Sequence, residues 1–455
     1  MRVFTFLCFI FVITLSTSHD VFAREAKQKF LDIQSIKTEQ GLHAWLVEDH
    51  SVPIISIKFA FRGTGSKNDP SDQQGLMRLL SNTLDEGAGD LDSQAFQKQL
   101  EDHSISLTFG NTRDHFTGQL KTLTKYKDKA FNLMKLALSS PRFDQDAIQR
   151  MRDGNKSRIR SSQSNPRWIA ARLQNDRIFE GHPYSLNSGG TLSSLDAITA
   201  DDLRRAHQTL SRDDLIIAVT GDINAEALSA VLDDLFASLP KKERADIKES
   251  PLQNAGKTYL YEKDIPQTVI LISQPGVKRE DPDYYAAQVM NFILGESGFG
   301  SRLMEEAREK RGLTYGIYSY FRDYAETDVM HVSTSTRNES AAEMLSLIHD
   351  EWSKIRDKTV SDKELKDAQA YLVGSLPLSL TSTDSIANIL LSLQLDHLPI
   401  DYLDTRSEKI NAVTQDDIQN VAKRLLNPDA FTTILVGKPD NIKDTISLTT
   451  LPNVE

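Results

Sequence analysis

The chain has 455 residues, of which 39% are hydrophobic and 26% are charged, and its net charge is −11. This is the composition of an ordinary globular protein, long enough to bury a large core. The acidic balance argues against nucleic acid or an anionic membrane as the main partner. The only cysteine is Cys8, so disulfides within the chain and zinc–thiolate sites are excluded.

Residues 1–23 are predicted to be a secretory signal peptide. Arg2 forms a short basic start, residues 3–15 are apolar, and residues 21–23 (Val-Phe-Ala) match a small-x-small cleavage site. The apolar stretch is short for a membrane span, and an uncleaved anchor is the alternative. We therefore expect a bacterial periplasmic protein with no membrane association after cleavage.

The first half opens with a predicted hairpin. Residues 41–50 and 53–62 alternate apolar and polar side chains, as two strands joined by a polar turn do. A loop follows at residues 63–70, and a helix opens at Gly75. Residues 181–184 (Gly-His-Pro-Tyr) are predicted to be a loop that serves packing. Other predicted elements are helices at 92–103, 127–138, 144–160, 166–179 and 199–210, two strands within 104–123, and a strand at 215–221.

Residues 240–258 are polar, charged and interrupted by prolines, which predicts a linker. Beyond it the chain repeats itself. The helix start Thr-x-Asp-Asp occurs at Thr199 and again at Thr414, and a strand that ends at Gly221 has a counterpart that ends at Gly437. Two matches in the same order, at nearly one offset, indicate a duplicated domain.

The stretch at residues 301–320 predicts a helix that stops at Gly312 and turns into a strand. Cations occupy the last helical turn, and glycine is favoured just after a helix. The next residues are rich in Tyr and Ile, which is typical of a strand. Such a turn can bring Arg308 and Tyr315 to one side of a cleft. On spacing alone, a surface arginine and a half-buried strand tyrosine are the alternative.

Together these features resemble the insulinase/pitrilysin superfamily of zinc peptidases, which includes the mitochondrial processing peptidase. The shared features are the Asp-His-Ser-x-Pro turn, the Gly-Ser…Asp-Pro loop, the Gly-Leu helix start, and an Arg followed seven residues later by a Tyr. The resemblance implies an α+β fold of two homologous lobes, each an antiparallel sheet with helices on one face, joined into a clamshell. The implied boundaries are an N-terminal lobe at 30–239, a linker at 240–258 and a C-terminal lobe at 259–448.

Active members of this superfamily carry an inverted zinc motif, H-x-x-E-H, on the helix that opens at Gly75. There, two histidines on one helix face bind Zn²⁺ and the glutamate activates the bound water. In this register the chain has Arg78, Ser81 and Asn82, and the region of the third ligand, residues 151–160, offers only Asp153. No two of the ten histidines are three to five residues apart. We therefore expect no metal in this chain and zinc in a partner subunit.

The second-half motifs are retained. The resemblance implies that Arg308 holds the substrate backbone and that Tyr315 helps to stabilise the tetrahedral intermediate. Gly295, Gly298 and Gly300 lie near the place where non-catalytic subunits of the mitochondrial enzyme carry a glycine-rich loop that handles substrate. A plain turn between helices is the alternative for these glycines.

A lost zinc motif beside a retained Arg/Tyr pair favours a non-catalytic subunit of a heterodimeric zinc metallopeptidase. A separate catalytic subunit would supply the metal, the water and the general base. This chain would complete the peptide chamber, bind peptide partly as an added strand, and lend its Arg/Tyr pair across the chamber. The alternatives are a peptide-binding or scaffold protein with no catalytic role, and a peptidase that uses an unfamiliar metal site.

Overall fold

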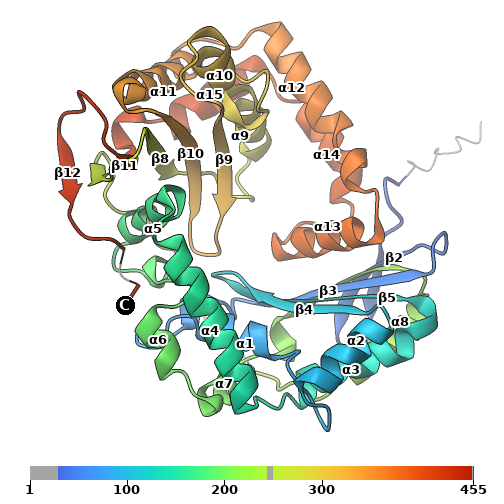
Figure 1. Ribbon diagram of the computed structural model, residues 1–455. Coiled ribbons are helices and arrows are strands. Elements are labelled where there is room, and N and C mark those ends of the chain that lie inside the picture. The colour runs from blue at the N-terminus through green and yellow to red at the C-terminus, as the bar shows by residue number, and fades with distance from the viewer. Residues whose placement is uncertain (1–28, 243–248, 453) are drawn as a thin grey trace, which may run out of the picture.

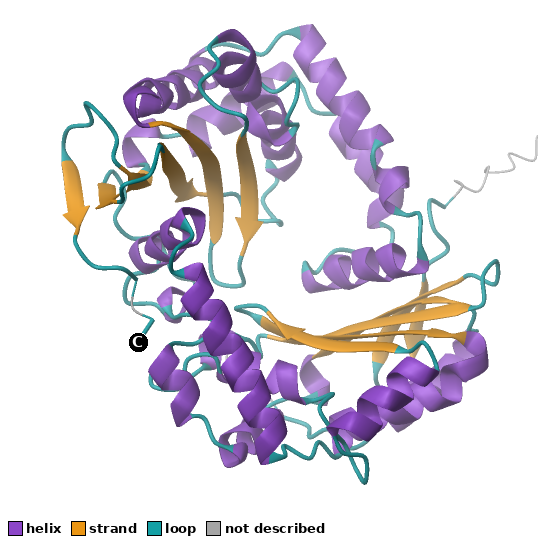
Figure 2. Ribbon diagram, viewed as in Figure 1, coloured by secondary structure: helices purple, strands orange, loops and turns teal. Residues whose placement is uncertain are grey.

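The computed structural model describes residues 29–242, 249–452 and 454–455. The predicted signal peptide and part of the predicted linker lie outside the described residues. Two six-stranded sheets stand apart, each with a layer of helices on its outer side (Figure 1, Figure 2). No helix within the described residues is long and apolar enough to cross a membrane.

The two sheets repeat one strand order. The first has the order β1-β2-β6-β3-β5-β4 and the second β12-β7-β11-β8-β10-β9. The first sheet contains Gln34–Lys37 (β1), His43–Glu48 (β2), Ile54–Arg62 (β3), Ser106–Asn111 (β4), His115–Leu123 (β5) and Leu215–Gly221 (β6). The second contains Thr258–Glu262 (β7), Gln267–Pro275 (β8), Ile317–Asp323 (β9), Asp328–Arg337 (β10), Thr432–Gly437 (β11) and Thr445–Leu448 (β12). The repeat predicted from the sequence therefore corresponds to β6 and β11.

Helices fill the connections between these strands. The first half contains Leu76–Thr83 (α1), Ser93–Asp102 (α2), Lys127–Ser139 (α3), Gln145–Ser162 (α4), Pro166–Ile178 (α5), Leu192–Ala197 (α6), Ala200–His207 (α7) and Ala225–Phe236 (α8). The second contains Tyr284–Asn291 (α9), Arg302–Met304 (α10), Ala341–Asp357 (α11), Asp362–Gly374 (α12), Thr383–Leu395 (α13), Tyr402–Asn411 (α14) and Gln415–Leu425 (α15). The predicted helices are confirmed, because their apolar spacing and N-caps are local signals.

The α+β prediction holds, but each sheet is mixed rather than purely antiparallel. β2 is parallel to β6, and β7 is parallel to β11 and β12. The other strand pairs of the two sheets are antiparallel. Parallel neighbours need a long crossover, and the helical segments between β2 and β6 and between β7 and β11 supply it.

The expectation of helices on one face of each sheet also needs a correction. α13 comes from the second half of the chain and packs on β3 and β6 of the first sheet. α5 comes from the first half and packs on β8 and β11 of the second sheet. Small apolar clusters form at both contacts, with Leu390 near Ala218 in one and Leu173 near Ile434 in the other. The two halves therefore interlock by exchanging one helix each.

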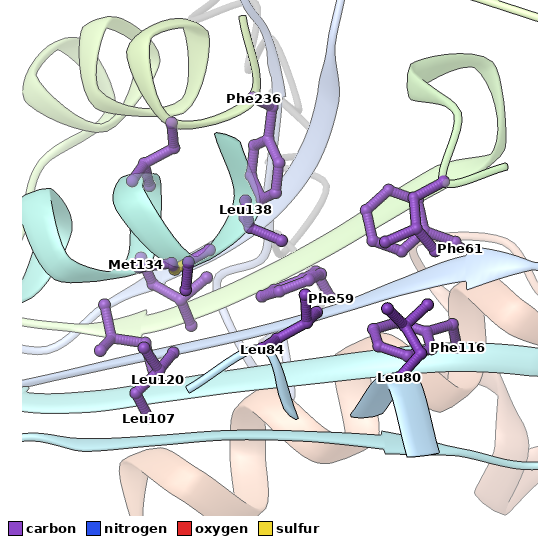
Figure 3. Close-up of a cluster of buried hydrophobic side chains, with 14 of the residues drawn as sticks. Phe59, Phe61, Leu80, Leu84, Leu107, Phe116, Leu120, Met134, Leu138 and Phe236 are labelled. Atoms are coloured by element: carbon purple, nitrogen blue, oxygen red, sulfur yellow. The ribbon is translucent and has the colours of Figure 1, made fainter. Parts of the chain in front are cut away.

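The largest core lies between the first sheet and its outer helices (Figure 3). Phe59 of β3 is fully buried there, with its ring centroid 5.3 Å from that of Phe236 and 5.9 Å from that of Phe61. Both pairs meet edge to face, a favourable arrangement for aromatic rings. The last residues of the chain return to this lobe, because Val454 is buried in the same core and its carbonyl accepts a hydrogen bond from the backbone of Leu192 (2.6 Å).

A buried ionic cluster also joins the lobes. Lys67 Nζ lies 2.7 Å from Glu326 Oε1 and 3.2 Å from Asp114 Oδ1. His182 Nε2 lies 2.7 Å from Glu326 Oε2. Glu326 is in the turn between β9 and β10, whereas the other three residues belong to the first half. The loop at residues 181–184, predicted to serve packing, therefore contacts the opposite lobe.

Candidate functional site

Helix α1 carries the positions of the lost zinc motif, and Asp69 fixes where this helix begins. The Asp69 carboxylate accepts hydrogen bonds from the backbone N–H groups of Gly75 (2.9 Å) and Met77 (3.1 Å). Burial raises the pKa of this carboxyl to about 7, and the backbone hydrogen bonds oppose the rise. Gly75 has φ of +86°, and a Cβ there would lie 2.7 Å from Gly190. The loop before α1 therefore sets the register of the helix.

The three substituted positions on α1 do not offer a zinc site. Arg78 is half-buried, and its guanidinium makes no hydrogen bond or ion pair with any residue that the structure describes. Ser81 is buried and donates to the carbonyl of Arg78 in its own helix (2.8 Å). Asn82 has a buried Oδ1 without a hydrogen-bond partner among the described residues. Zinc in proteins is held by His, Cys and carboxylate ligands, and this helix face presents a cation instead.

Helix α4 packs against α1 and includes the whole segment, residues 151–160, where the third ligand was expected. Asp153 is exposed and accepts a hydrogen bond from Gln149 Nε2 (3.0 Å), so it is not turned toward α1. Asn155 is one of the buried residues of this segment. Its Oδ1 accepts from Arg158 Nη1 (3.3 Å), and its Nδ2 has no partner among the described residues. Sequence analysis missed Asn155, although its helical spacing from the buried Ile159 was a usable signal.

Two cations approach each other across these helices. Burial lowers the pKa of Arg78, and the positive charge of Arg158 lowers it further. Arg78 and Asn82 are four residues apart, so they share a helix face. Within the described part of the chain, no group of three or more His, Cys, Asp or Glu residues could hold a metal ion. We call Arg78, Asn82, Asn155 and Arg158 the Arg78–Asn155 cluster.

The second candidate region lies where the helix after α9 turns into β9. This stretch contains two π-helical turns, Phe292–Glu296 and Glu305–Lys310, on either side of α10. The predicted stop at Gly312 is confirmed, since this residue has φ of +60° and its N–H donates to the carbonyl of Arg308 (3.1 Å). π-Helical turns occur frequently at functional sites.

Arg308 and Tyr315 are both accessible. The Arg308 guanidinium carbon lies 4.4 Å above the ring centroid of Phe299, and Nε is 3.4 Å from Glu309 Oε1. Tyr315 is 87% exposed and makes no hydrogen bond with a described residue. The predicted alternative of a half-buried strand tyrosine is therefore wrong. Phe299, which is 67% exposed, is a partner of Arg308 that sequence analysis missed.

The three glycines of the proposed substrate loop have different environments. Gly295 is buried in the first π-helical turn, and a Cβ there would lie 2.4 Å from Ser319 Oγ. Gly298 and Gly300 have φ of +64° and +97°, which favour glycine. Gly295 therefore permits close packing, whereas the other two bend the chain on either side of Phe299.

A salt bridge anchors this loop to α12. Arg302 donates from Nε to Glu364 Oε1 (2.6 Å) and from Nη2 to Oε2 (3.1 Å). Burial opposes ionisation of Glu364, but hydrogen bonds from Arg302 and Ser361 lower its pKa to about 2. β9 is the outer strand of its sheet and presents Tyr318 and Tyr320 as exposed side chains. Accessible aromatic residues thus continue from the loop onto the strand.

A cavity of about 810 Å³ lies between the lobes. It is lined by the ends of β3 and α13 and by the β4–β5 and β9–β10 turns. Burial, with a smaller contribution from the negative charge of Asp323, raises the pKa of Asp328 to about 7 and that of Asp396 to about 6. The predicted site residues do not line this cavity. They form two separate groups, one on α1 and one beside β9.

Comparison with known proteins also divides the chain into two segments, one for each group of site residues. A model described as insulinase (peptidase family M16) matches residues 49–190, and a model described as the peptidase M16 inactive domain matches residues 197–372. The non-peptidase homolog YmxG of Helicobacter pylori is 27% identical over 382 residues, which are 83% of this chain and 87% of that protein. The beta subunit of the mitochondrial-processing peptidase of Saccharomyces cerevisiae is 24% identical over 345 residues, 72% of this chain and 74% of that subunit.

A solved structure of a peptidase M16 inactive domain from Pseudomonas fluorescens has a TM-score of 0.83 at 28% sequence identity. It covers 92% of this chain and 100% of that one. The first matched segment holds the α1 and α4 positions that have lost zinc ligands, and the second holds the Arg/Tyr pair. The chain therefore belongs to the insulinase superfamily, peptidase family M16, and it is similar to a relative named as a non-peptidase homologue.

Proposed function

We propose that this protein is the non-catalytic subunit of a periplasmic heterodimeric zinc peptidase. It completes the peptide chamber and supplies Arg308 and Tyr315 to the zinc site of a catalytic subunit that carries an intact H-x-x-E-H motif. The periplasmic location follows from the predicted signal peptide. Zinc belongs to the partner, because the residues of α1 and α4 do not suit it.

The exposure of Tyr315 carries this proposal. Exposing most of a tyrosine ring to water gives no packing energy, and its hydroxyl makes no hydrogen bond with the described residues that could explain its position. A phenol held in the open on a rigid turn can donate a hydrogen bond to a group brought by another molecule. An oxyanion that forms on a peptide carbonyl is a suitable acceptor.

Arg308 supports the same role. Stacking on Phe299 limits the orientations of its planar guanidinium while the edge of the group stays accessible. A guanidinium held in one plane can donate to a peptide carbonyl, or bind a carboxylate with two parallel hydrogen bonds. Arg308 would position the peptide backbone, and Tyr315 would stabilise the charge that develops when water attacks the scissile carbonyl.

The test measures peptide turnover by a co-encoded H-x-x-E-H chain, alone and after assembly with this protein. Tyr315→Phe and Arg308→Ala should each lower the turnover of the assembled pair by about 10²-fold, the effect of losing one oxyanion donor. Tyr371→Phe is the matched control, because Tyr371 is also exposed, on α12 of the same lobe, at 59%. Arg311→Ala is the control for Arg308.

Three results would contradict the proposal. Equal turnover of the wild-type pair and the Tyr315→Phe pair would remove the role of the phenol. Equal losses in Tyr315→Phe and Tyr371→Phe would indicate a general surface effect. Failure of this protein to alter the turnover of any co-encoded peptidase chain would favour the peptide-binding or scaffold function.

A further inference from the structure

We propose that the Arg78–Asn155 cluster is a carboxylate-binding site, at the place where active relatives hold a metal cation. Its ligand is the carboxylate of a peptide, carried either by the peptide C-terminus or by an Asp or Glu side chain. The inference rests on the proposed function only in taking peptides as the source of that carboxylate. The cluster itself is defined by four side chains on the facing helices α1 and α4.

The first observation is an unpaired cation. Two other arginines with little exposure have acceptors: Arg152 donates to the carbonyls of Leu195 and Ile198, and Arg302 binds Glu364. The guanidinium of Arg78 has no acceptor among the described residues, and its nearest charged influence is repulsion from Arg158. A half-buried charge without a partner is costly, and two neighbouring guanidinia raise the cost.

The second observation is a pair of unpartnered amide atoms. Asn155 is only 5% exposed, and its Nδ2 donor has no acceptor among the described residues. The buried Oδ1 of Asn82 likewise has no donor there. Buried polar atoms in proteins are nearly always hydrogen-bonded. Oxygen and nitrogen of an asparagine amide exchange places by a flip of the group, so both residues can present N–H donors to one anion.

A carboxylate matches this donor set. Guanidinium groups bind carboxylates with short, charge-assisted hydrogen bonds, often two at once. One bound carboxylate would neutralise the repulsion between Arg78 and Arg158 and would accept from the amide of Asn155. Proteins retain locally unfavourable arrangements chiefly at functional sites. The charge of this position is inverted relative to a zinc site, so its ligand changes from a cation to an anion.

Direct binding tests the site without any partner subunit. The probes are three fluorescent peptides of one neutral sequence: one with a free C-terminal carboxylate, one with a C-terminal amide, and one amide with a single internal Glu. The full mature chain should bind at least one carboxylate peptide about 10-fold more tightly than the neutral amide, since one charge-assisted contact supplies about that factor. Preference for the free C-terminus identifies the chain end as the ligand, and preference for the Glu peptide identifies the side chain.

Two variants and one control locate the effect. Arg78→Gln and Arg158→Gln should each reduce the carboxylate preference to less than about twofold, because each removes one guanidinium of the pair. Arg160→Gln changes charge equally on the same helix, at an exposed position outside the cluster, and should keep the preference. Equal affinity of the wild type for all three peptides overturns the site. Equal loss in Arg160→Gln overturns it as well, since it would reveal long-range electrostatics.

Thermal stability provides a second readout. Arg78→Gln removes a charge that is repelled by Arg158 and has no acceptor among the described residues. The melting temperature of this variant should therefore be up to about 3 °C above that of the wild type, and not below it. A large loss of stability would show that Arg78 serves the fold and would overturn the proposal. The two proposals can fail independently. If Tyr315→Phe leaves the turnover of the assembled pair unchanged, the subunit proposal fails, but carboxylate binding by this chain is still expected.

Discussion

The two lobes share one scaffold and differ at equivalent places in it. Both contain a six-stranded sheet with the same spatial order and a Thr-x-Asp-Asp helix start with nearly identical backbone angles, φ −103° with ψ 169° at Thr199 and 168° at Thr414. They differ in the segments that follow β3 in the first lobe and β8 in the second. The first lobe continues into α1 with its cationic cluster, and the second into α9, two π-helical turns and an exposed aromatic loop.

This difference separates the structural features that both copies of the duplicated domain share from the residues that are specific to one lobe. Caps, strand ends and sheet order are the parts that any copy needs in order to fold. The exposed face of the helical segment after β3 or β8 is not needed for folding, so its residues can differ between the lobes. The first lobe presents Arg78 there, whose guanidinium has no acceptor among the described residues, and the second presents Arg308, Phe299 and Tyr315. The functional candidates are therefore residues that differ between the lobes and either stay accessible or lack a hydrogen-bond partner among the described residues.

The largest expected effect concerns the ionic cluster, which belongs to neither lobe alone. Lys67→Met should lower the free energy of unfolding by about 3–5 kcal/mol, because it removes from a largely buried cluster the cation that pairs with both Glu326 and Asp114. The measurement is the shift of the urea midpoint, read by fluorescence. Lys125→Met, at an exposed position in the first lobe, is the control. A change below about 1 kcal/mol would mean that the ionic cluster contributes little to holding the lobes together.

The strand-end glycines allow a direct test of the duplicated scaffold. A Cβ at Gly221 would lie 2.0 Å from the carbonyl oxygen of Ile54, and one at Gly437 would lie 2.6 Å from Thr268 Oγ1. Both have positive φ, +134° and +155°. Gly221→Ala should cost about 3 kcal/mol and Gly437→Ala about 2 kcal/mol, because the backbone contact at the first glycine is much shorter than the contacts with Thr268 at the second.

Urea unfolding of the two variants measures these costs. Gly154→Ala is the matched control, since a Cβ there meets nothing within 4 Å on helix α4. It should stabilise the protein by about 0.5–1 kcal/mol. A larger loss at the second glycine than at the first would show that the two strand ends are not equivalent.

Local signals made much of the fold predictable. The repeat, the helix starts and the stop at Gly312 depend on residues within one or two turns of each other, and periodicity reports them. The exchange of α5 and α13 and the contact of Lys67 with Glu326 join residues hundreds of positions apart, which no local pattern encodes. At the site, spacing indicated Arg308, but it could not indicate that Phe299 stacks on it.

The cavity between the lobes adds a pH dependence. The pKa of Asp328 is raised to about 7 and that of Asp396 to about 6, first by burial and then by neighbouring acids. Both values exceed the ordinary aspartate value of 3.8. Between pH 4 and 7 the folded protein therefore holds protons that the unfolded chain has released, and stability falls as pH rises.

We expect the melting temperature to be a few degrees lower at pH 8 than at pH 5.5, by scanning calorimetry. Asp328→Asn should flatten this dependence, because the amide does not titrate. The pH dependence also distinguishes the lobes. The cavity aspartates with a raised pKa, Asp323, Asp328 and Asp396, come from the second half, whereas the first half contributes Asp114. A melting temperature that rises from pH 5.5 to pH 8 would contradict the assignment.

The smallest effect concerns the two helix caps, which look alike but differ in burial. Each threonine hydroxyl accepts from the backbone N–H of the Asp three residues later, at 3.2 Å in both lobes. Asp202 is buried whereas Asp417 is exposed. Thr199→Ala should therefore cost about 1–2 kcal/mol and Thr414→Ala about 0.5–1 kcal/mol. Serine at either position keeps the cap and should restore most of the loss, so equal losses for Ala and Ser would assign the effect to the threonine methyl group.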